Sequence, residues 1–177
     1  MENEIVQSIV RDAAHARSAN LRDLFRSRVR SADSLQEVKE GIIEVLMGLN
    51  NRERARIGFV SGIITSDGEE SIGRNTEVLD DFTSALKNSV SFGVFSQVDV
   101  FDYELASRMR GRSCRDDWQE LWRGVLGSSC VTDIFMTPRW EKSCGSVDEY
   151  KTAIGMGINI FHVYRHHLTN ELHIVRK

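Results

Sequence analysis

A serine-bearing loop that runs into a predicted helix is the first candidate for chemistry. Residues 137–146 follow an apolar segment typical of a buried strand, and they end in Ser143, Gly145 and Ser146, next to the start of the predicted helix. Free backbone amides and the dipole at a helix N-terminus favour an anion such as phosphate, and either serine hydroxyl is placed to bind it. A plainer interpretation stays open, in which Ser146 only caps the helix and Gly145 only turns the chain.

Glu149 adds a carboxylate to this loop. It lies near the start of the same helix, on the turn that faces a ligand if residues 143–146 wrap around one. A surface residue that only complements the helix dipole needs no such position, and the neighbouring Asp148 fits that role better. The spacing therefore favours Glu149 as a group that contacts the ligand.

A second loop, after the apolar run 57–61, also suits an anionic or sugar-like ligand. It begins with Ser61 and Gly62 and ends near Arg74, so it offers hydroxyls, backbone amides and a cation. Arg74 is equally consistent with a plain surface residue at a helix N-terminus. Because ligands of open α/β sheets bind outside the carboxyl ends of the strands, both loops are candidates for the same site.

Strands that alternate with helices must position these loops. Short apolar runs typical of buried parallel strands alternate with segments whose apolar residues recur at helical spacing. The pattern predicts a small, mostly parallel sheet with helices on both faces, an α/β fold that is flavodoxin-like in the broad sense. The predicted strands are 57–61, part of 90–101, 131–136 and 158–163, and the predicted helices are 75–86, 118–126 and 147–156.

The first fifty residues have a different character. Apolar residues recur at helical spacing between residues 34 and 49, after a more broken helical pattern over 5–30. We therefore divide the chain into a helical extension, 1–50, and an α/β domain, 51–177. The arginines of residues 22–30 have acidic neighbours and are interpreted as a solvated face rather than as a phosphate-binding patch.

Composition limits the class of protein. The 177 residues carry a net charge of −3 and are 41% hydrophobic, as in ordinary globular chains, and no apolar run is long enough for a membrane span. The N-terminus lacks the apolar core of a signal peptide, so we expect a cytoplasmic protein without a membrane partner. The slightly acidic balance gives no reason to expect nucleic acid as a partner.

No metal and no cofactor are expected. Cys114, Cys130 and Cys144 lack CxxC spacing, so they indicate neither a disulfide framework nor a zinc site. The histidines between residues 162 and 173 lack the HExxH spacing of zinc enzymes and are interpreted as structural or surface residues.

The segment that contains the serine loop resembles a known superfamily. Residues 138–149 (PRWEKSCGSVDE), followed by Ala153 and by GINIF at 157–161, are similar to the P-x-W-x-x-S-x-G-x-x-x-E segment of the nucleoside 2-deoxyribosyltransferase-like superfamily. That superfamily includes nucleoside deoxyribosyltransferases and nucleoside 5′-monophosphate N-glycosidases. The resemblance covers roughly residues 57–163 and implies the α/β fold of that superfamily. It also takes in Ser61, Gly62, Asn75, Phe82 and Asp133.

The resemblance implies roles for the acidic and serine side chains. Glu149 matches the glutamate nucleophile that attacks the anomeric carbon, which is the logic of a retaining glycosidase. Ser143 matches a serine that binds phosphate in the monophosphate hydrolases. Enzymes of the superfamily that act on free nucleosides tend to have an aspartate at this position. A second carboxylate helps to protonate the departing base, and we select Asp117 from Asp116, Asp117 and Glu120. The alternative for each of the three is helix capping.

Two positions depart from the pattern of the superfamily. Gly58 and Ile63 stand near the positions where the monophosphate hydrolases have a tyrosine and an arginine, so Arg74 is the candidate to replace the missing cation. Trp140 either stacks on a base or closes the loop by hydrophobic packing.

The expected function is that of an N-glycosidase that cleaves the base–sugar bond of a nucleoside 5′-monophosphate. A nucleoside deoxyribosyltransferase, or a non-catalytic nucleotide-binding sensor in which Glu149 hydrogen-bonds a ribose, are the alternatives. Either way a small-molecule nucleotide or nucleoside is the expected partner. Members of the superfamily assemble as dimers or larger oligomers, so the resemblance also implies a homodimer or higher homo-oligomer, with the N-terminal helices as a candidate interface.

Overall fold

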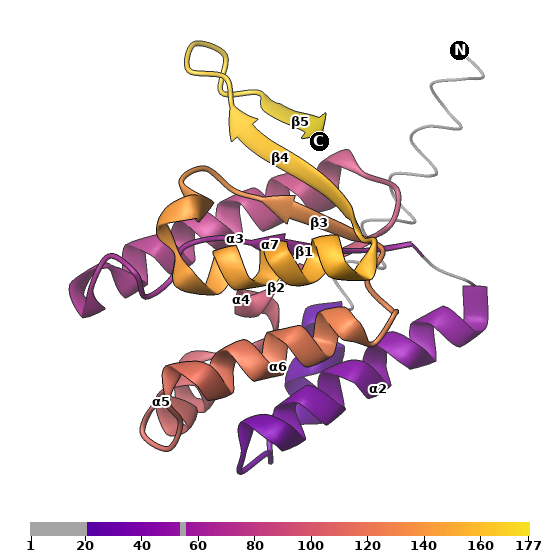
Figure 1. Cartoon of the computed structure of the whole chain (residues 1–177), viewed down its shortest axis with the longest axis vertical. Helices are drawn as coiled ribbons and strands as arrows, with labels where there is room; N and C mark the ends of the chain where they lie inside the picture. Colours follow the sequence, from indigo (N-terminus) through magenta and orange to yellow (C-terminus); the bar gives the residue numbers. More distant parts are fainter. Residues whose placement is uncertain (1–20, 54–55) are drawn as a thin grey trace.

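The sheet is mixed but mostly parallel. The computed structural model describes residues 21–53 and 56–177, and five strands of this part form one sheet (Figure 1). Their order across the sheet is β2 (Gly93–Ser96), β1 (Ile57–Ser61), β3 (Asp133–Met136), β4 (Asn159–Arg165) and β5 (Leu172–Arg176). β1 is parallel to β2 and to β3, β3 is parallel to β4, and β5 is antiparallel to β4.

Helices occupy the connections between the parallel strands. The α/β class with a mostly parallel sheet, predicted from the alternating pattern, is confirmed. Residues 21–29 are also helical. The helices are α2 (Leu35–Glu53) before β1, α3 (Ile72–Ser89) between β1 and β2, α4 (Gln97–Val100), α5 (Tyr103–Arg110) and α6 (Arg115–Gly127) between β2 and β3, and α7 (Cys144–Met156) between β3 and β4, with 3₁₀ turns η1 (Glu69–Ser71) and η2 (Trp140–Lys142).

Several boundaries differ from the predicted ones. α3 begins at Ile72, so Asn75 lies inside the helix and does not cap it; its side chain donates instead to the carbonyl oxygen of Ile64 (3.1 Å). α7 begins at Cys144, three residues earlier than predicted, because Ser143 provides the cap. α7 ends at Met156, where the predicted helix also ends, and Gly157 caps it in the left-handed conformation (φ 68°). β5 and α5 were not predicted.

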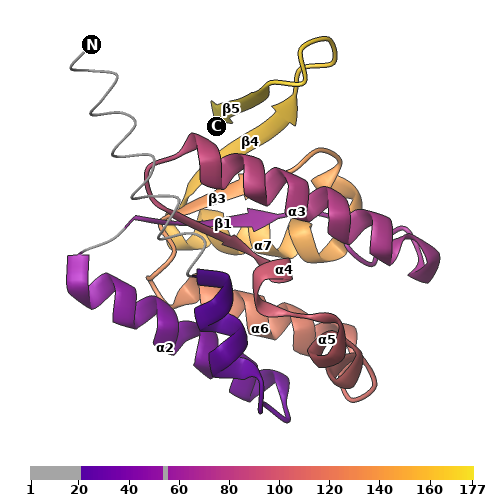
Figure 2. The same cartoon turned by 180° about the vertical axis from the view of Figure 1, so that it is seen from behind.

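Helices cover both faces of the sheet. α3 packs on one face, where its buried residues meet Val60, Val94 and Phe135. The other face carries α6 and α7, with Phe59 of β1 stacked on Trp122 of α6 at a centroid distance of 5.0 Å. Figure 1 is seen from the α7 side and Figure 2 from the α3 side.

The N-terminal helices pack into the core of the α/β unit. Phe25 meets Phe95 of β2 at a centroid distance of 5.0 Å. The apolar stripe of α2, including Val38, Ile42 and Leu46, is fully buried, and α2 lies against α6 (Figure 2). The surface that covers this stripe therefore belongs to the same chain.

The carboxyl ends of the parallel strands meet at one edge of the sheet. The helices α3, α6 and α7 all start at this edge, on the left in Figure 1. Each helix thus directs its N-terminal amides toward the region where the predicted site loops lie. None of the described helices is long and apolar enough to cross a membrane.

Candidate functional site

Three elements converge on the carboxyl group of Glu149. The side chain of Glu149 projects from α7 and the residue is only 2% exposed. The Ser61 hydroxyl, at the end of β1, donates a hydrogen bond to Oε2 of Glu149. The Gln97 amide, in the first residue after β2, donates to Oε1 at 2.9 Å. Glu149 is therefore held at the carboxyl edge of the sheet by the last residue of β1 and by the residue that follows β2.

The end of β1 is fixed by its neighbour β3. The backbone N–H and the hydroxyl of Thr137 both donate to the carbonyl oxygen of Ser61, each at 3.0 Å. Gly62 follows, and a Cβ atom there would lie 2.5 Å from the Thr137 hydroxyl oxygen, so only glycine fits without a shift. Ser61 and Gly62, selected from the sequence, thus lie beside Thr137, the first residue of the loop that joins β3 to α7.

Burial controls the charge of Glu149. The pKa of this carboxyl is raised from 4.5 to about 8, chiefly because burial removes the hydration of the charged form, and the nearby charge of Asp148 adds a smaller contribution in the same direction. The hydrogen bonds from Ser61 and Gln97 act in the opposite direction, since they favour the charged form. Glu149 is consequently mostly neutral at neutral pH, with about one tenth ionised.

The N-terminus of α7 places two buried serines beside Glu149. The Ser143 hydroxyl accepts a hydrogen bond from the Ser146 backbone N–H (3.3 Å) and caps the helix. Ser146 lies one turn before Glu149, and its hydroxyl is buried without a partner among the described residues. Gly145 leaves the first turn open, with no atom closer than 3.8 Å to the position of an added Cβ. The Ser146 hydroxyl and the first turn of α7 therefore lie one helical turn before Glu149, a combination suited to a polar anion.

Arg74 lies in the first turn of α3, where its residue is exposed. The loop that precedes it, 62–71, is tied back to α3 by the hydrogen bond from Asn75 to Ile64. The structure shows no contact that brings Arg74 to Glu149, so its role as a replacement cation stays a prediction.

Asp117 caps α6. Its carboxylate accepts a hydrogen bond from the Cys114 backbone N–H at 2.7 Å, and this bond lowers the pKa of Asp117. The residue is exposed, and Asp116 and Glu120 beside it are exposed as well. Asp117 therefore makes the capping contact that was the alternative for these carboxylates. The proposed catalytic role of Asp117 stays a prediction.

Trp140 packs within the protein. Its ring stacks on Tyr150 of α7 at a centroid distance of 4.4 Å and an angle of 26°, and His162 of β4 lies 6.0 Å away. This contact closes the loop between β3 and α7, which was one of the two interpretations left open for Trp140.

Gln97 is the site residue that the sequence did not reveal. A usable signal exists, since Gln97 is the first polar residue with a long side chain after the buried strand β2, at the edge where ligands bind. The signal was hidden because the strand was predicted only as part of 90–101, without an end, whereas β2 ends at Ser96 and a capped turn of helix follows it. The carboxylate of Asp99 accepts from the Ser96 backbone N–H at 3.0 Å and starts that turn.

Asp133 lies at the other end of its strand, away from Glu149. Its carboxylate accepts two hydrogen bonds from Arg56, at 2.6 and 2.7 Å, and one from Thr132. This ion pair, in which Asp133 is buried and the Arg56 side chain is half exposed, joins the residue before β1 to the first residue of β3 and has a structural role. Within residues 21–53 and 56–177, no three His, Cys, Asp or Glu side chains are grouped so as to hold a metal ion.

The serine loop, the end of β1 and the start of α4 thus form one polar site around Glu149, and its chemistry must be inferred from these residues alone. Comparison with known proteins adds no assignment, since no family model, no curated protein and no solved structure matches this chain.

Proposed function

We propose that the protein is an N-glycosidase that cleaves the base–sugar bond of a nucleoside 5′-monophosphate at Glu149. The observation that carries the proposal is the position of this buried carboxyl group, held by Ser61 and Gln97 and lying one turn after Ser146 in the first part of α7. The resemblance of residues 138–149 to the nucleoside 2-deoxyribosyltransferase-like superfamily supports the same assignment.

The strand order supports a flavodoxin-like fold for the α/β unit. The chain passes from β1 to β2 on one side and then crosses back to β3 on the other, so the connection changes direction between β1 and β3. Ligands of open parallel sheets bind at such switch points. Ser61 ends β1 and the loop to α7 follows β3, which puts both halves of the candidate site at this point.

The reaction is a double displacement at the anomeric carbon. An ionised oxygen of Glu149 forms a bond to C1′ while the bond from C1′ to the base nitrogen breaks, and the base takes up a proton. Water then attacks C1′, the bond to Glu149 breaks, and ribose 5-phosphate and the free base are released. Ser61 and Gln97 act as positioning residues, since each holds one oxygen of the carboxyl group.

The phosphate is placed at the N-terminus of α7. The Ser146 hydroxyl, which has no partner among the described residues, and the Ser143 hydroxyl would bind its oxygens together with free amides of the first turn. Because Glu149 is 2% exposed, the sugar must displace a neighbouring side chain to reach it. Of Ser61, Gln97 and Glu149, only Gln97 is partly exposed, so its side chain needs the smallest movement to admit the sugar.

A substrate panel tests the proposal directly. The protein is incubated with ribonucleoside and deoxyribonucleoside 5′-monophosphates, with and without a second base as acceptor, and free base is measured by chromatography. We expect base release that Glu149→Gln abolishes and that Glu141→Gln, which changes an exposed carboxylate, leaves intact. Failure of every monophosphate to release base, in either condition, would exclude both hydrolysis and transfer.

Loss of activity in Asp117→Asn with unchanged stability would support the role of Asp117 as proton donor.

The dependence of the rate on pH distinguishes the two chemical roles open to Glu149. As a nucleophile it acts only when ionised, so kcat/KM is expected to rise with pH until the pH passes about 8, the pKa of this carboxyl. As a proton donor it would act only when neutral, and kcat/KM would fall over the same range. The measurement is a pH–rate profile for the best monophosphate, and a falling profile would contradict the nucleophile assignment.

A nucleotide-binding protein without catalysis is the second candidate. The neutral state of Glu149 favours it, because a protonated carboxyl group is a good hydrogen-bond donor to a ribose hydroxyl. In that case monophosphates bind, as measured by calorimetry, without release of base.

A further inference from the structure

The outer edge of β5 has no partner among the described residues. β5 is the last strand of the sheet and pairs only with β4. The β4–β5 hairpin projects beyond the helices in both views (Figures 1 and 2), and Ile174 and Val175 are 37% and 47% exposed. An exposed edge of this kind is a template for pairing with another strand.

The backbone groups that point outward can be identified from the ladder. Lys177 N–H donates to Ile160 O at 3.0 Å, and His166 N–H donates to Glu171 O at 2.9 Å. Backbone groups alternate in direction along an antiparallel strand, so 171, 173, 175 and 177 face β4. Leu172, Ile174 and Arg176 therefore direct their N–H and C=O groups away from the sheet.

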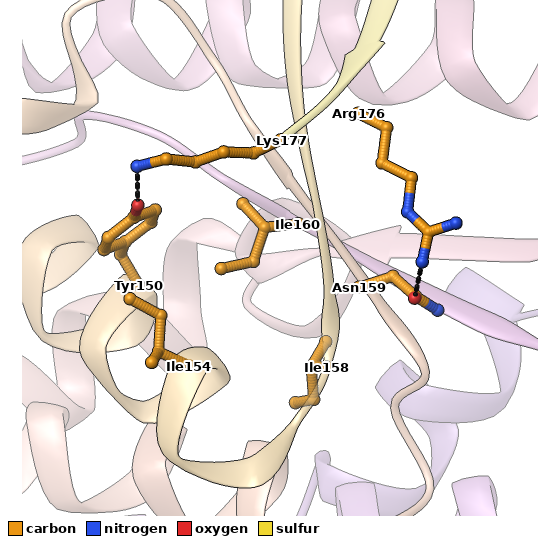
Figure 3. Close-up of a pocket in the computed structure, with 7 residues that line it drawn as sticks. All are labelled: Tyr150, Ile154, Ile158, Asn159, Ile160, Arg176 and Lys177. Atoms are coloured by element: carbon orange, nitrogen blue, oxygen red, sulfur yellow. Dashed lines mark hydrogen bonds between the residues drawn. The ribbon is translucent and has the colours of Figure 1, made fainter.

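Two cations at one end of this edge lack an acidic partner. A cavity of about 380 Å³ lies between α7 and the ends of β4 and β5, with Ile154, Ile158 and Ile160 on its wall (Figure 3). At its rim Lys177 donates to the Tyr150 hydroxyl and Arg176 donates to the Asn159 side-chain oxygen (2.7 Å). Both partners are neutral, and neither cation forms an ion pair within the described part of the chain.

We propose that a second copy of this chain pairs with the outer edge of β5, antiparallel, about a twofold axis through Ile174. The two sheets then form one continuous sheet. In this register Leu172 faces Arg176 of the partner subunit, and Glu171 faces Lys177 of the partner subunit, on the side of the sheet that carries the cavity. The inference makes no use of Glu149 and stands apart from the proposed function.

The register follows from three conditions. Outward-facing residues must lie opposite outward-facing residues, which restricts the axis to whole residue positions. An axis at Ile174 pairs the whole of β5, Leu172–Arg176, with β5 of the second copy. An axis at any other residue leaves part of the strand unpaired. The same axis puts Glu171 opposite Lys177 of the partner subunit at each end of the paired strands. It also keeps the cations of the two copies apart. A twofold, self-complementary contact is the usual form of a homodimer.

A proline substitution separates this edge from other surfaces. We expect the wild-type protein to be a dimer by analytical ultracentrifugation, and Ile174→Pro to be a folded monomer. The N–H of Ile174 points away from β4, so proline removes a hydrogen bond only from the dimer. In the wild type, hydrogen exchange at Leu172, Ile174 and Arg176 should slow with increasing protein concentration, while exchange at His173 and Val175 stays unchanged.

Charge reversal provides a test that does not depend on proline. Glu171→Lys and Lys177→Glu are each expected to weaken the dimer about tenfold or more, because like charges then face each other twice in every dimer. The double variant should recover the wild-type dissociation constant. Glu120→Lys, the same change on the exposed face of α6, should leave it unaltered.

Three results would overturn the inference. The first is a wild-type protein that is monomeric at about 0.1 mM, since a dimer with a dissociation constant below about 10 μM would be mostly assembled there. The second is a dimer that neither Ile174→Pro nor the charge reversals weaken, which would place the interface elsewhere. The third is a monomer in which the outward amides of β5 are protected at every concentration, since a segment of the same chain would then cover the edge.

Discussion

Above about pH 8, Glu149→Gln is expected to be more stable than the wild type by several kcal/mol. The pKa of Glu149 is about 8 in the folded protein against an ordinary value of 4.5, so between these values the folded state holds a proton that the unfolded state has lost. The stability of the wild type therefore falls as pH rises through this window. The full penalty is at most about 5 kcal/mol and is reached only above the folded pKa.

The amide of the variant fits the same contacts. Its oxygen accepts from Gln97, its nitrogen donates to the Ser61 hydroxyl, and no charge has to be buried. Below about pH 4.5 both proteins are neutral at this position in both states, so their stabilities should converge.

Urea unfolding at a series of pH values measures this difference. The free energy of unfolding of the wild type should decline relative to that of Glu149→Gln between about pH 4.5 and 8. Glu141→Gln, which changes an exposed carboxylate in η2, serves as the control and should follow the wild type. Curves for wild type and Glu149→Gln that stay parallel over the whole range would contradict the burial-raised pKa.

Removal of the Asp99 carboxylate is expected to destabilise the protein by about 3 to 5 kcal/mol, because it leaves the largely buried Lys87 ammonium without a partner. Asp99 is fully buried and pairs with Arg22 of the first helix and with Lys87 of α3, each at 2.7 Å. The Lys87 side chain is 11% exposed, so water cannot replace the lost carboxylate there. Arg22 is more exposed and also reaches Asp80, which limits its share of the loss.

Asp99→Ala should also disturb the candidate site. The same carboxylate accepts from the Ser96 backbone N–H and starts the helical turn that carries Gln97. Unfolding in urea at neutral pH measures the loss of stability, and hydrogen exchange at residues 96–100 reports on the turn. Asp81→Ala is the matched control, since it removes an ion pair whose carboxylate side chain is 62% exposed, and it should change stability by no more than about 1 kcal/mol. An equal effect of the two variants would show that burial of Asp99 is unimportant.

The alternation of apolar runs and amphipathic segments was enough to predict the α/β class. Buried parallel strands such as Ile57–Ser61 are apolar up to their last residue, and helices such as α6 show their inner face at helical spacing, so both are determined by local pattern. β5 has no such pattern, because its residues are partly exposed on both faces and its pairing depends on β4. The start of α7 was misplaced because Ser143 and Ser146 are equally good caps in sequence and only the packed loop distinguishes them.

The sequence by itself determined the chemistry that is available to this protein: an acidic residue near a helix start, serines before it, and a glycine-bearing loop after a buried strand. Which of these groups act together was decided by the tertiary structure. The parallel pairing of β1 with β2 and β3 brings Ser61 and Gln97 onto Glu149, residues that are 88 and 52 positions away in the chain. Tertiary burial also sets the charge of Glu149, because a pKa depends on the loss of water and on distant hydrogen bonds, which local sequence does not specify.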